Sequence, residues 1–256
     1  MSVQLPARGS TFDAAVLKRK SQHALLQVLG TNERLWLRNR DLWHVMPGHV
    51  VHVKVDRRLR CPVHVPCVQG HILDVRVDPA ALGLPPLQVE LRVANNLGER
   101  AFEMERIWPG AHHGDDPIQE AVGLSRDGEC AEAKQLLMDV LADDLRCLDA
   151  HAHLGNLEFL VYPQHAWLHY AIGVAIGDHA LGPGFSGELP WRYTGNRPFL
   201  RSVFGLGLSW WRLERDQEAR AAFERLMSLD PMDELNAMPC WRDVRRGYAW
   251  DESGGR

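Results

Sequence analysis

Residues 200–231 have the sequence LRSVFGLGLSWWRLERDQEARAAFERLMSLDP, which contains the clearest helical pattern in the chain. The small residues Gly207 and Ala219 lie twelve positions apart, and Phe223 follows Ala219 by four. This spacing is typical of two antiparallel helices in which small residues permit a close approach and an aromatic ring fills the space beside them. Pro231 has no backbone N–H and therefore ends the second helix. The segment predicts a helical hairpin.

Earlier segments repeat this pattern. Gly155 again follows a leucine, and Ala166 and Tyr170 reproduce the step of four from alanine to an aromatic residue. The arrangement resembles the tetratricopeptide repeat (TPR) family, whose helix–turn–helix unit has a period of about 34 residues. The resemblance covers about half of the chain and implies a solenoid of about three hairpins. Through residues 144–156 and 196–201, the chain also resembles uncharacterised bacterial proteins that join a β-rich N-terminal region to such repeats.

The first hundred residues show a different periodicity. Apolar side chains occur at every second position in residues 34–38, 51–55, 73–77 and 87–93. This alternation is typical of strands with one buried and one solvated face. Residues 12–20 are the exception, because their apolar spacing and the N-capping residues before them predict a short helix. Four to six short strands over this length predict a small curled sheet or a barrel.

Turn-forming residues separate the two parts. Residues 108–117 are rich in Pro and Gly, which interrupt regular elements. The charge balance also changes there: residues 1–100 hold 14 Lys and Arg against 8 Asp and Glu, whereas residues 101–256 hold 15 against 25. We therefore expect an α+β protein with a β-rich domain at residues 1–110 and a TPR-like helical domain at residues 111–256.

The TPR resemblance implies protein or peptide binding. In that family the first helix of each hairpin lines a groove, and particular positions of the helix face into it. Those positions correspond in the middle hairpin to Asp149, Ala152, Asn156, Phe159 and Leu160, and in the last hairpin to Arg201, Phe204, Leu208, Trp211 and Arg212. Aromatic and Arg side chains dominate binding energies at interfaces, so we expect an adaptor or scaffold that binds a partner segment with acidic and apolar side chains. Packing in the protein core is the alternative role of the same residues.

The basic N-terminal part supports an alternative function, that of a nucleic-acid-associated factor. Residues 18–20 and 57–60 carry six of its Lys and Arg side chains, which are suited to phosphates. Trp36 and Trp43 would supply rings for stacking on bases. A solvated charged surface is the simpler explanation of the same residues.

Other motifs do not combine into a catalytic or metal site. Four weak candidates for zinc ligands follow one another at short spacing, namely Cys61, His64, Cys67 and His71. Prolines between them force an extended backbone, which points His64 away from the two cysteines. Four further histidines, His151, His153, His165 and His169, are expected on the outer face of a repeat. We expect no metal, no cofactor and no enzymatic activity.

Two further expectations concern location and one insertion. The chain has no apolar run long enough to span a membrane, no secretory signal and only five cysteines, which together predict a cytoplasmic protein. Residues 181–198 separate two repeats and include three aromatic residues. Disordered linkers avoid aromatic residues, so we expect an ordered loop that buries Trp191 over the repeats, as a groove wall or as a cap.

Overall fold

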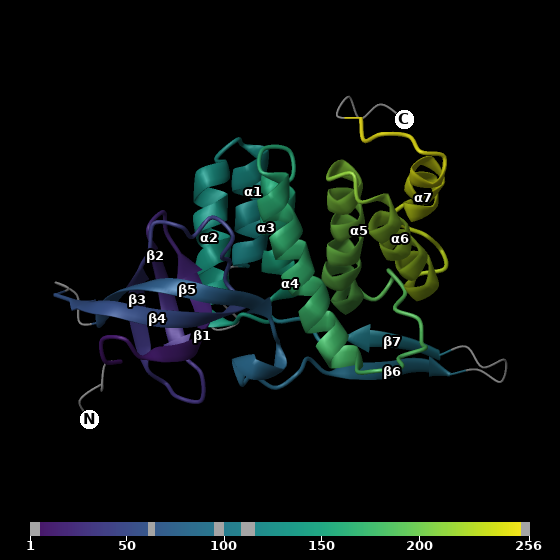
Figure 1. Cartoon of the computed structure of the whole chain (residues 1–256). Helices are drawn as coiled ribbons and strands as arrows, with labels where there is room; N and C mark the ends of the chain where they lie inside the picture. Colours follow the sequence, from purple (N-terminus) through teal and green to yellow (C-terminus); the bar gives the residue numbers. More distant parts are fainter. Residues whose placement is uncertain (1–5, 61–64, 95–99, 109–115, 252–256) are drawn as a thin grey trace.

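The computed structural model of the chain describes residues 6–60, 65–94, 100–108 and 116–251. A β-barrel lies beside an array of helices, and a β-hairpin runs beneath the lower ends of α4 and α5 (Figure 1). The strands are β1 Thr11–Arg19, β2 His23–Val28, β3 Arg34–Arg38, β4 His49–Leu59, β5 Cys67–Val77, β6 Val89–Ala94 and β7 Arg100–Met104. The helices are α1 Pro117–Arg126, α2 Cys130–Asp143, α3 Leu148–Glu158, α4 Pro163–Leu181, α5 Arg197–Arg212, α6 Asp216–Leu229 and α7 Ala237–Arg245, with short 3-10 turns at Ala80–Leu82 and Thr194–Asn196. The predicted α+β class is confirmed.

The barrel is closed by five strands in the order β1-β2-β3-β5-β4. β4 pairs with β1 antiparallel, and β3 pairs with β5 in parallel. This topology is that of the OB-fold, a five-stranded Greek-key barrel. Its interior is apolar because alternate side chains such as Leu26, Leu37 and Val53 point inward and are fully buried.

The helix predicted for residues 12–20 is wrong, because this segment forms β1. Ala14 and Val16 face the barrel interior, whereas Ala15 and Leu17 point outward and pack against the helices. A short apolar run fits both periodicities, and pairing with strands on both sides favours the extended form. The alternation of residues 87–93 forms β6 outside the barrel, paired only with β7. β2 and β7 were not predicted.

The helices form three antiparallel hairpins, α1–α2, α3–α4 and α5–α6, and α7 packs on α6. α3 lies beside both α1 and α5. Ala219 and Phe223 are fully buried between α5 and α6, and a Cβ atom at Gly207 would lie 2.7 Å from the Phe223 ring. The close approach predicted for this hairpin is therefore present. Membership of the TPR family stays a prediction.

Two of the three apolar cores combine side chains from both parts of the chain. Ala15 and Leu17 of β1 join a core formed by α1, α2 and α3. Met104 of β7 joins the core formed by α4 to α7. The buried Asn196 links the hairpin to α5, since its Oδ1 accepts from the Met104 N–H at 2.8 Å and its amide donates to the Phe102 carbonyl at 2.9 Å. The predicted division at residue 110 falls among residues 109–115, outside the described residues.

The insertion at residues 181–198 folds back over the helices, as predicted. Leu189 is fully buried and its N–H donates to the Leu229 carbonyl at 2.7 Å. The carbonyl of Glu188 accepts from the Phe102 N–H at 2.9 Å, which joins the loop to β7. Trp191 is half-buried, so its predicted burial is only partial.

Candidate functional site

Helices α3 and α5 contribute side chains to one face of the array, which we call the inner face and define by His153, Asn156 and Arg201. Asp149 of α3 is only 2% exposed and lies beneath this face. Its carboxylate accepts from the Arg106 Nε at 2.5 Å and lies 3.8 Å from Nη1 of Arg201. Arg106 follows β7, so the hairpin also contributes to the inner face. Segments far apart in the sequence therefore meet at a single buried carboxylate.

Two tryptophans support the arginines of this site. The guanidiniums of Arg197 and Arg201 lie 5.3 Å and 5.2 Å from the ring centre of Trp191, and that of Arg106 lies 4.0 Å from the Trp108 ring. We call Arg106, Arg197 and Arg201 the arginine cluster. Such stacking holds a guanidinium plane in place while its N–H groups remain able to donate.

The charges of the arginine cluster act on one another. Burial lowers the pKa of Arg201 from its ordinary value; Asp149 opposes this shift, whereas the charges of Arg197 and Arg106 add to it. Two guanidiniums, those of Arg106 and Arg201, thus lie against the Asp149 carboxylate, and the charge of Arg197 acts on Arg201. The geometry is suited to an anionic group, because Arg binds carboxylate and phosphate oxygens with paired N–H donors.

A pocket of about 250 Å³ opens between α1 and α3, next to Asn156. The exposed Asn156 accepts through Oδ1 a hydrogen bond of 2.6 Å from the Tyr170 hydroxyl. Tyr170 reaches this position because Gly155 has no side chain. A Cβ atom at Gly155 would lie only 2.4 Å from the Tyr170 ring. The Asn156 amide nitrogen is thereby oriented as a donor at the mouth of the pocket.

The other predicted groove residues have different surroundings. Phe204 and Leu208 are half-buried and pack on the helical core, the alternative role of these positions. Phe159, Trp211 and Arg212 lie together at the far ends of α3 and α5, where the Phe159 and Trp211 rings contact the C-terminal segment of the chain itself. The structure therefore brings Asn156 and Arg201 to the inner face, and the remaining residues to the core or to the chain end.

A cluster of buried histidines lies where the barrel meets α3 and α4. His151 and His169 are fully buried with ring centres 5.8 Å apart, and His49 of β4 is 2% exposed. The outer-face position expected for His151 and His169 is wrong, because the barrel covers this side of the helices. It is also wrong for His153, which lies on the inner face beside Asn156. Burial lowers the pKa of His49 and of His151 to about 4, and that of His169 well below its ordinary value. These three imidazoles are neutral at pH 7.

Glu158 lies beside the histidines and is 3% exposed. Burial opposes its ionisation, but contacts with His165 and Lys134 outweigh this effect and lower the pKa of the carboxyl to about 2. The pair of Lys134 and Glu158 therefore carries opposite charges next to neutral imidazoles. Within the described ranges, no three His, Cys, Asp or Glu side chains are arranged to hold a metal ion.

The weak zinc candidates are only partly described. Cys67 is buried at the start of β5, and His71 on the same strand is exposed with Nε2 3.1 Å from Oδ2 of Asp56. Cys61 and His64 lie outside the described residues. Cys67 and His71 thus have roles in the strand and in an ion pair.

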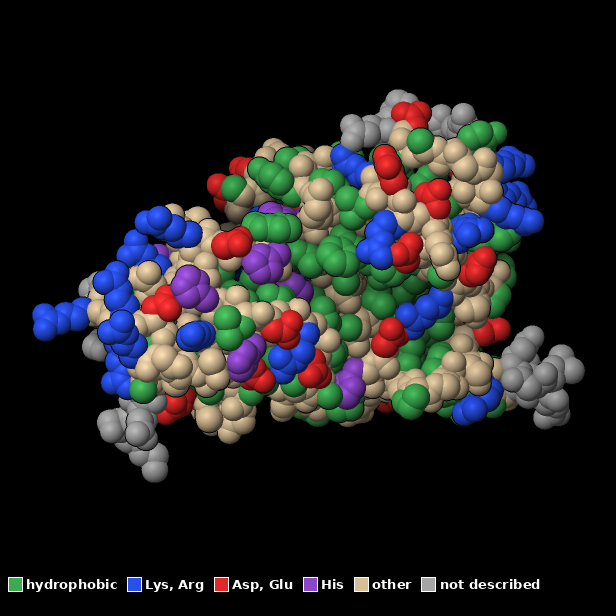
Figure 2. All heavy atoms as spheres, viewed as in Figure 1, with side chains coloured by type: hydrophobic (Ala, Val, Ile, Leu, Met, Phe, Trp, Pro, Cys, Tyr) green, Lys and Arg blue, Asp and Glu red, His purple; other side chains and the backbone are tan. Residues whose placement is uncertain are grey.

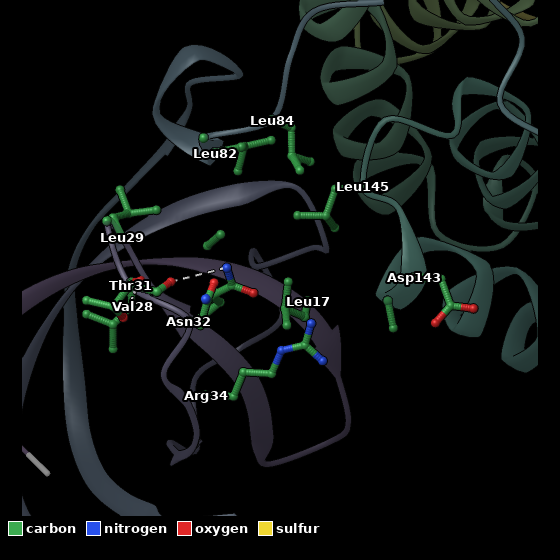
Figure 3. A pocket seen from close by; sticks show the side chains of 15 residues that line it. Leu17, Val28, Leu29, Thr31, Asn32, Arg34, Leu82, Leu84, Asp143 and Leu145 are labelled. Atoms are coloured by element: carbon green, nitrogen blue, oxygen red, sulfur yellow. Dashed lines mark hydrogen bonds between the residues drawn. The ribbon is translucent and has the colours of Figure 1, made fainter. Parts of the chain in front are cut away.

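A pocket of about 490 Å³ lies in the seam between the barrel and α2. Figure 3 shows Leu82 and Leu84 on one side of it, Arg34 rising from β3, and Leu145 and Asp143 on the helical side. Its lining mixes apolar side chains with the polar side chains of Gln27, Thr31 and Asn32 and the charged ones of Arg34 and Asp143. None of the predicted site residues belongs to this pocket.

The outer face of β2 and β3 combines an aromatic ring with basic groups. Trp36 lies on this face between Arg34 and Arg38, and the Lys20 Nζ lies 5.6 Å from its ring centre. Between residues 11 and 77 the sequence has 11 Lys and Arg against 5 Asp and Glu. Lys and Arg side chains gather over the barrel end of the molecule (Figure 2).

Sequence reasoning missed three members of the inner face. Arg106 lies outside the repeats, so the repeat spacing gives it no position. Arg197 precedes the positions mapped from the family, and the pairing of Trp191 with arginines depends on how the insertion folds.

The described helices include none that is long and apolar enough to span a membrane. No protein-family model matches the chain, and a comparison with curated proteins found no similar sequence.

Proposed function

We propose that the inner face binds an extended segment of a partner protein, and that the arginine cluster receives an acidic side chain of that segment. The observation that carries this proposal is that the guanidiniums of Arg106 and Arg201 share the buried Asp149 carboxylate, while Arg197 lies beside Arg201 at the Trp191 ring. One buried carboxylate balances one of these charges, and the half-buried Arg201 remains accessible. In this proposal the protein is an adaptor without a catalytic step.

The surroundings of the arginine cluster support an extended ligand. Asn156 and Arg201 lie on neighbouring helices, so a segment crossing α3 and α5 reaches both. The amide of Asn156 is able to donate to a main-chain carbonyl of such a segment, and the pocket beside it accommodates a small apolar side chain. A partner segment in which acidic and apolar side chains alternate would place an acidic group at the arginine cluster and an apolar group in the pocket beside Asn156.

Replacing Arg201 tests this proposal. We expect Arg201→Ala to weaken partner binding at least tenfold, because a partly desolvated Arg at an interface centre commonly contributes about 2 kcal/mol or more. The measurement is affinity capture from the native cell with wild-type and variant protein, followed by titration of a labelled peptide from the captured partner. Arg242→Ala on the exposed surface of α7 is the matched control and should bind as wild type. Equal binding by the Arg201 variant would contradict the proposal.

A second function, binding of single-stranded nucleic acid by the barrel, is favoured by one specific observation. The barrel has the topology of the OB-fold, and Trp36 lies among basic side chains on β2 and β3, the face that such folds use for oligonucleotides. Fold-level analogy carries this candidate, and the position of Trp36 gives it a testable residue.

Replacing Trp36 tests the second function. If the barrel binds single strands, Trp36→Ala should weaken binding of a fluorescent 15-nucleotide oligo-dT about tenfold, since base stacking contributes about 1–3 kcal/mol per base. Met232→Ala, which removes a side chain that is 78% exposed after α6, is the control. Affinity should also fall steeply with salt, whereas binding by aromatic contacts at the inner face should not. No binding at 50 mM salt would exclude this candidate.

A further inference from the structure

The C-terminal segment of the chain folds back onto the ends of α3 and α5. After α7, the Tyr248 N–H donates to the Asp243 carbonyl at 3.0 Å, and the Trp211 indole donates to the Tyr248 carbonyl at 2.8 Å. The Trp250 ring then lies edge-to-face against Phe159 and against Trp211, with ring centres 5.4 Å and 5.3 Å apart. One tryptophan side chain thus occupies a site formed by two other aromatic rings.

This site, which we call the aromatic notch, is defined by Phe159, Trp211 and Arg212. Arg212 contacts both the ring and the chain turn that form it. Its guanidinium lies 5.5 Å from the Phe159 ring centre and donates to the carbonyls of Phe159 and Leu160. A site built by helix ends and a fixed guanidinium is preorganised for an aromatic ring.

The present occupant of the aromatic notch does not satisfy its own polar group. The indole nitrogen of Trp250 is buried and has no hydrogen-bond partner among the described residues. A buried donor without a partner destabilises the conformation that buries it. The segment that carries Trp250 has no regular secondary structure, and Tyr248 and Ala249 are exposed. The unpaired indole N–H therefore makes the occupation of the notch by Trp250 less favourable.

An apolar surface borders the aromatic notch. Leu160 and Val161 are each 67% exposed and Tyr162 is 56% exposed in the turn between α3 and α4. Three consecutive exposed apolar side chains in a folded protein are typical of an interaction surface. This surface extends the contact area available to a segment whose aromatic side chain enters the notch.

We infer that the aromatic notch is a binding site for an aromatic side chain of an extended partner segment, and that Trp250 occupies it as an intramolecular competitor. The partner segment presents Trp, Tyr or Phe and displaces the C-terminal segment when it binds. This inference adds a second binding subsite to the proposed function. It depends on the proposed function only for the existence of the partner segment. A peptide with the sequence of the C-terminal segment can test whether the notch binds an aromatic side chain that is not attached to the chain.

The test uses the full chain and a labelled peptide of residues 246–256, RGYAWDESGGR. We expect the Trp250→Ala protein, whose notch is vacated, to bind this peptide at least tenfold more tightly than wild type, in which the attached segment competes at an effective concentration in the mM range. A peptide with alanine in place of tryptophan is the matched control and should not bind. Adding Trp211→Ala to the Trp250→Ala protein should abolish binding.

Three results would overturn the inference. They are equal binding of both peptides, no binding to the Trp250→Ala protein, and a fall of its melting temperature by more than about 8 °C, which would make Trp250 part of the core. Arg201→Ala in the Trp250→Ala background separates this inference from the proposed function. It should leave binding of the tail peptide unchanged, whether or not it weakens binding of the partner.

Discussion

Acidification from pH 7.5 to 4.5 should lower the free energy of unfolding by an amount on the order of 5 kcal/mol, because His49 and His151 are buried as neutral imidazoles. In the unfolded chain both groups bind a proton near pH 6.5, whereas in the folded protein they do so only near pH 4. The unfolded state therefore binds more protons between these values. Stability is fully present above pH 6.5 and is lost as the pH falls towards 4. His169 shifts in the same direction and adds to the loss.

The measurement is urea unfolding followed by tryptophan fluorescence at several pH values between 7.5 and 4.5. A loss of this size is a large part of the total stability of an ordinary domain, about 5–15 kcal/mol. His169→Gln removes one of the buried imidazoles and should make the loss smaller. A flat profile in the wild type would show that the histidines are hydrated rather than buried.

The second large effect is expected from Ala219→Glu. Ala219 is fully buried between α5 and α6, so the new carboxylate would have neither water nor a cation to stabilise it. Burial of an unpaired charge is among the most costly single changes, and we expect a loss of more than about 4 kcal/mol, with unfolding of α5 to α7 at 37 °C. Circular dichroism during urea unfolding measures this loss.

Helix α6 also provides the matched control for this prediction. Ala221→Glu places the same side chain two residues further on, at an exposed position. It should change the stability by less than about 0.5 kcal/mol, since surface substitutions without special contacts have small effects. If both variants melt like the wild type, α5 and α6 do not pack as described.

The predictability of the fold differed between its two parts for a physical reason. Helical hairpins depend on contacts close in sequence, so Gly207, Ala219 and Phe223 reveal their own packing. The barrel depends on pairing between distant strands, and β1 has an apolar run that fits either a helix or a strand until β2 and β4 pair with it. Local patterns therefore gave the class of the barrel but not its strand order.

Only those residues of the candidate site that lie within the helical hairpins could be predicted from the repeat spacing. Asn156 and Arg201 follow from positions within helices, and both lie on the inner face. Arg106 and Trp191 come from a hairpin and an insertion, whose placement depends on the tertiary hydrogen bonds of Asn196 and Leu189. The burial of His151 and His169 was missed because it requires the barrel to cover α3 and α4, which no helical pattern indicates.

Folded elements cover both ends of the hairpin array, and this affects where a further hairpin could be added to the chain. An open stack of repeats grows by adding a unit at a terminus, and two such stacks can join end to end into filaments. In this protein β1 packs against α2 at one end, and α7 packs on α6 at the other. A new repeat at either end would have to displace a folded element. Growth is thus restricted to the joints between hairpins, and residues 181–198 occupy such a joint between α4 and α5.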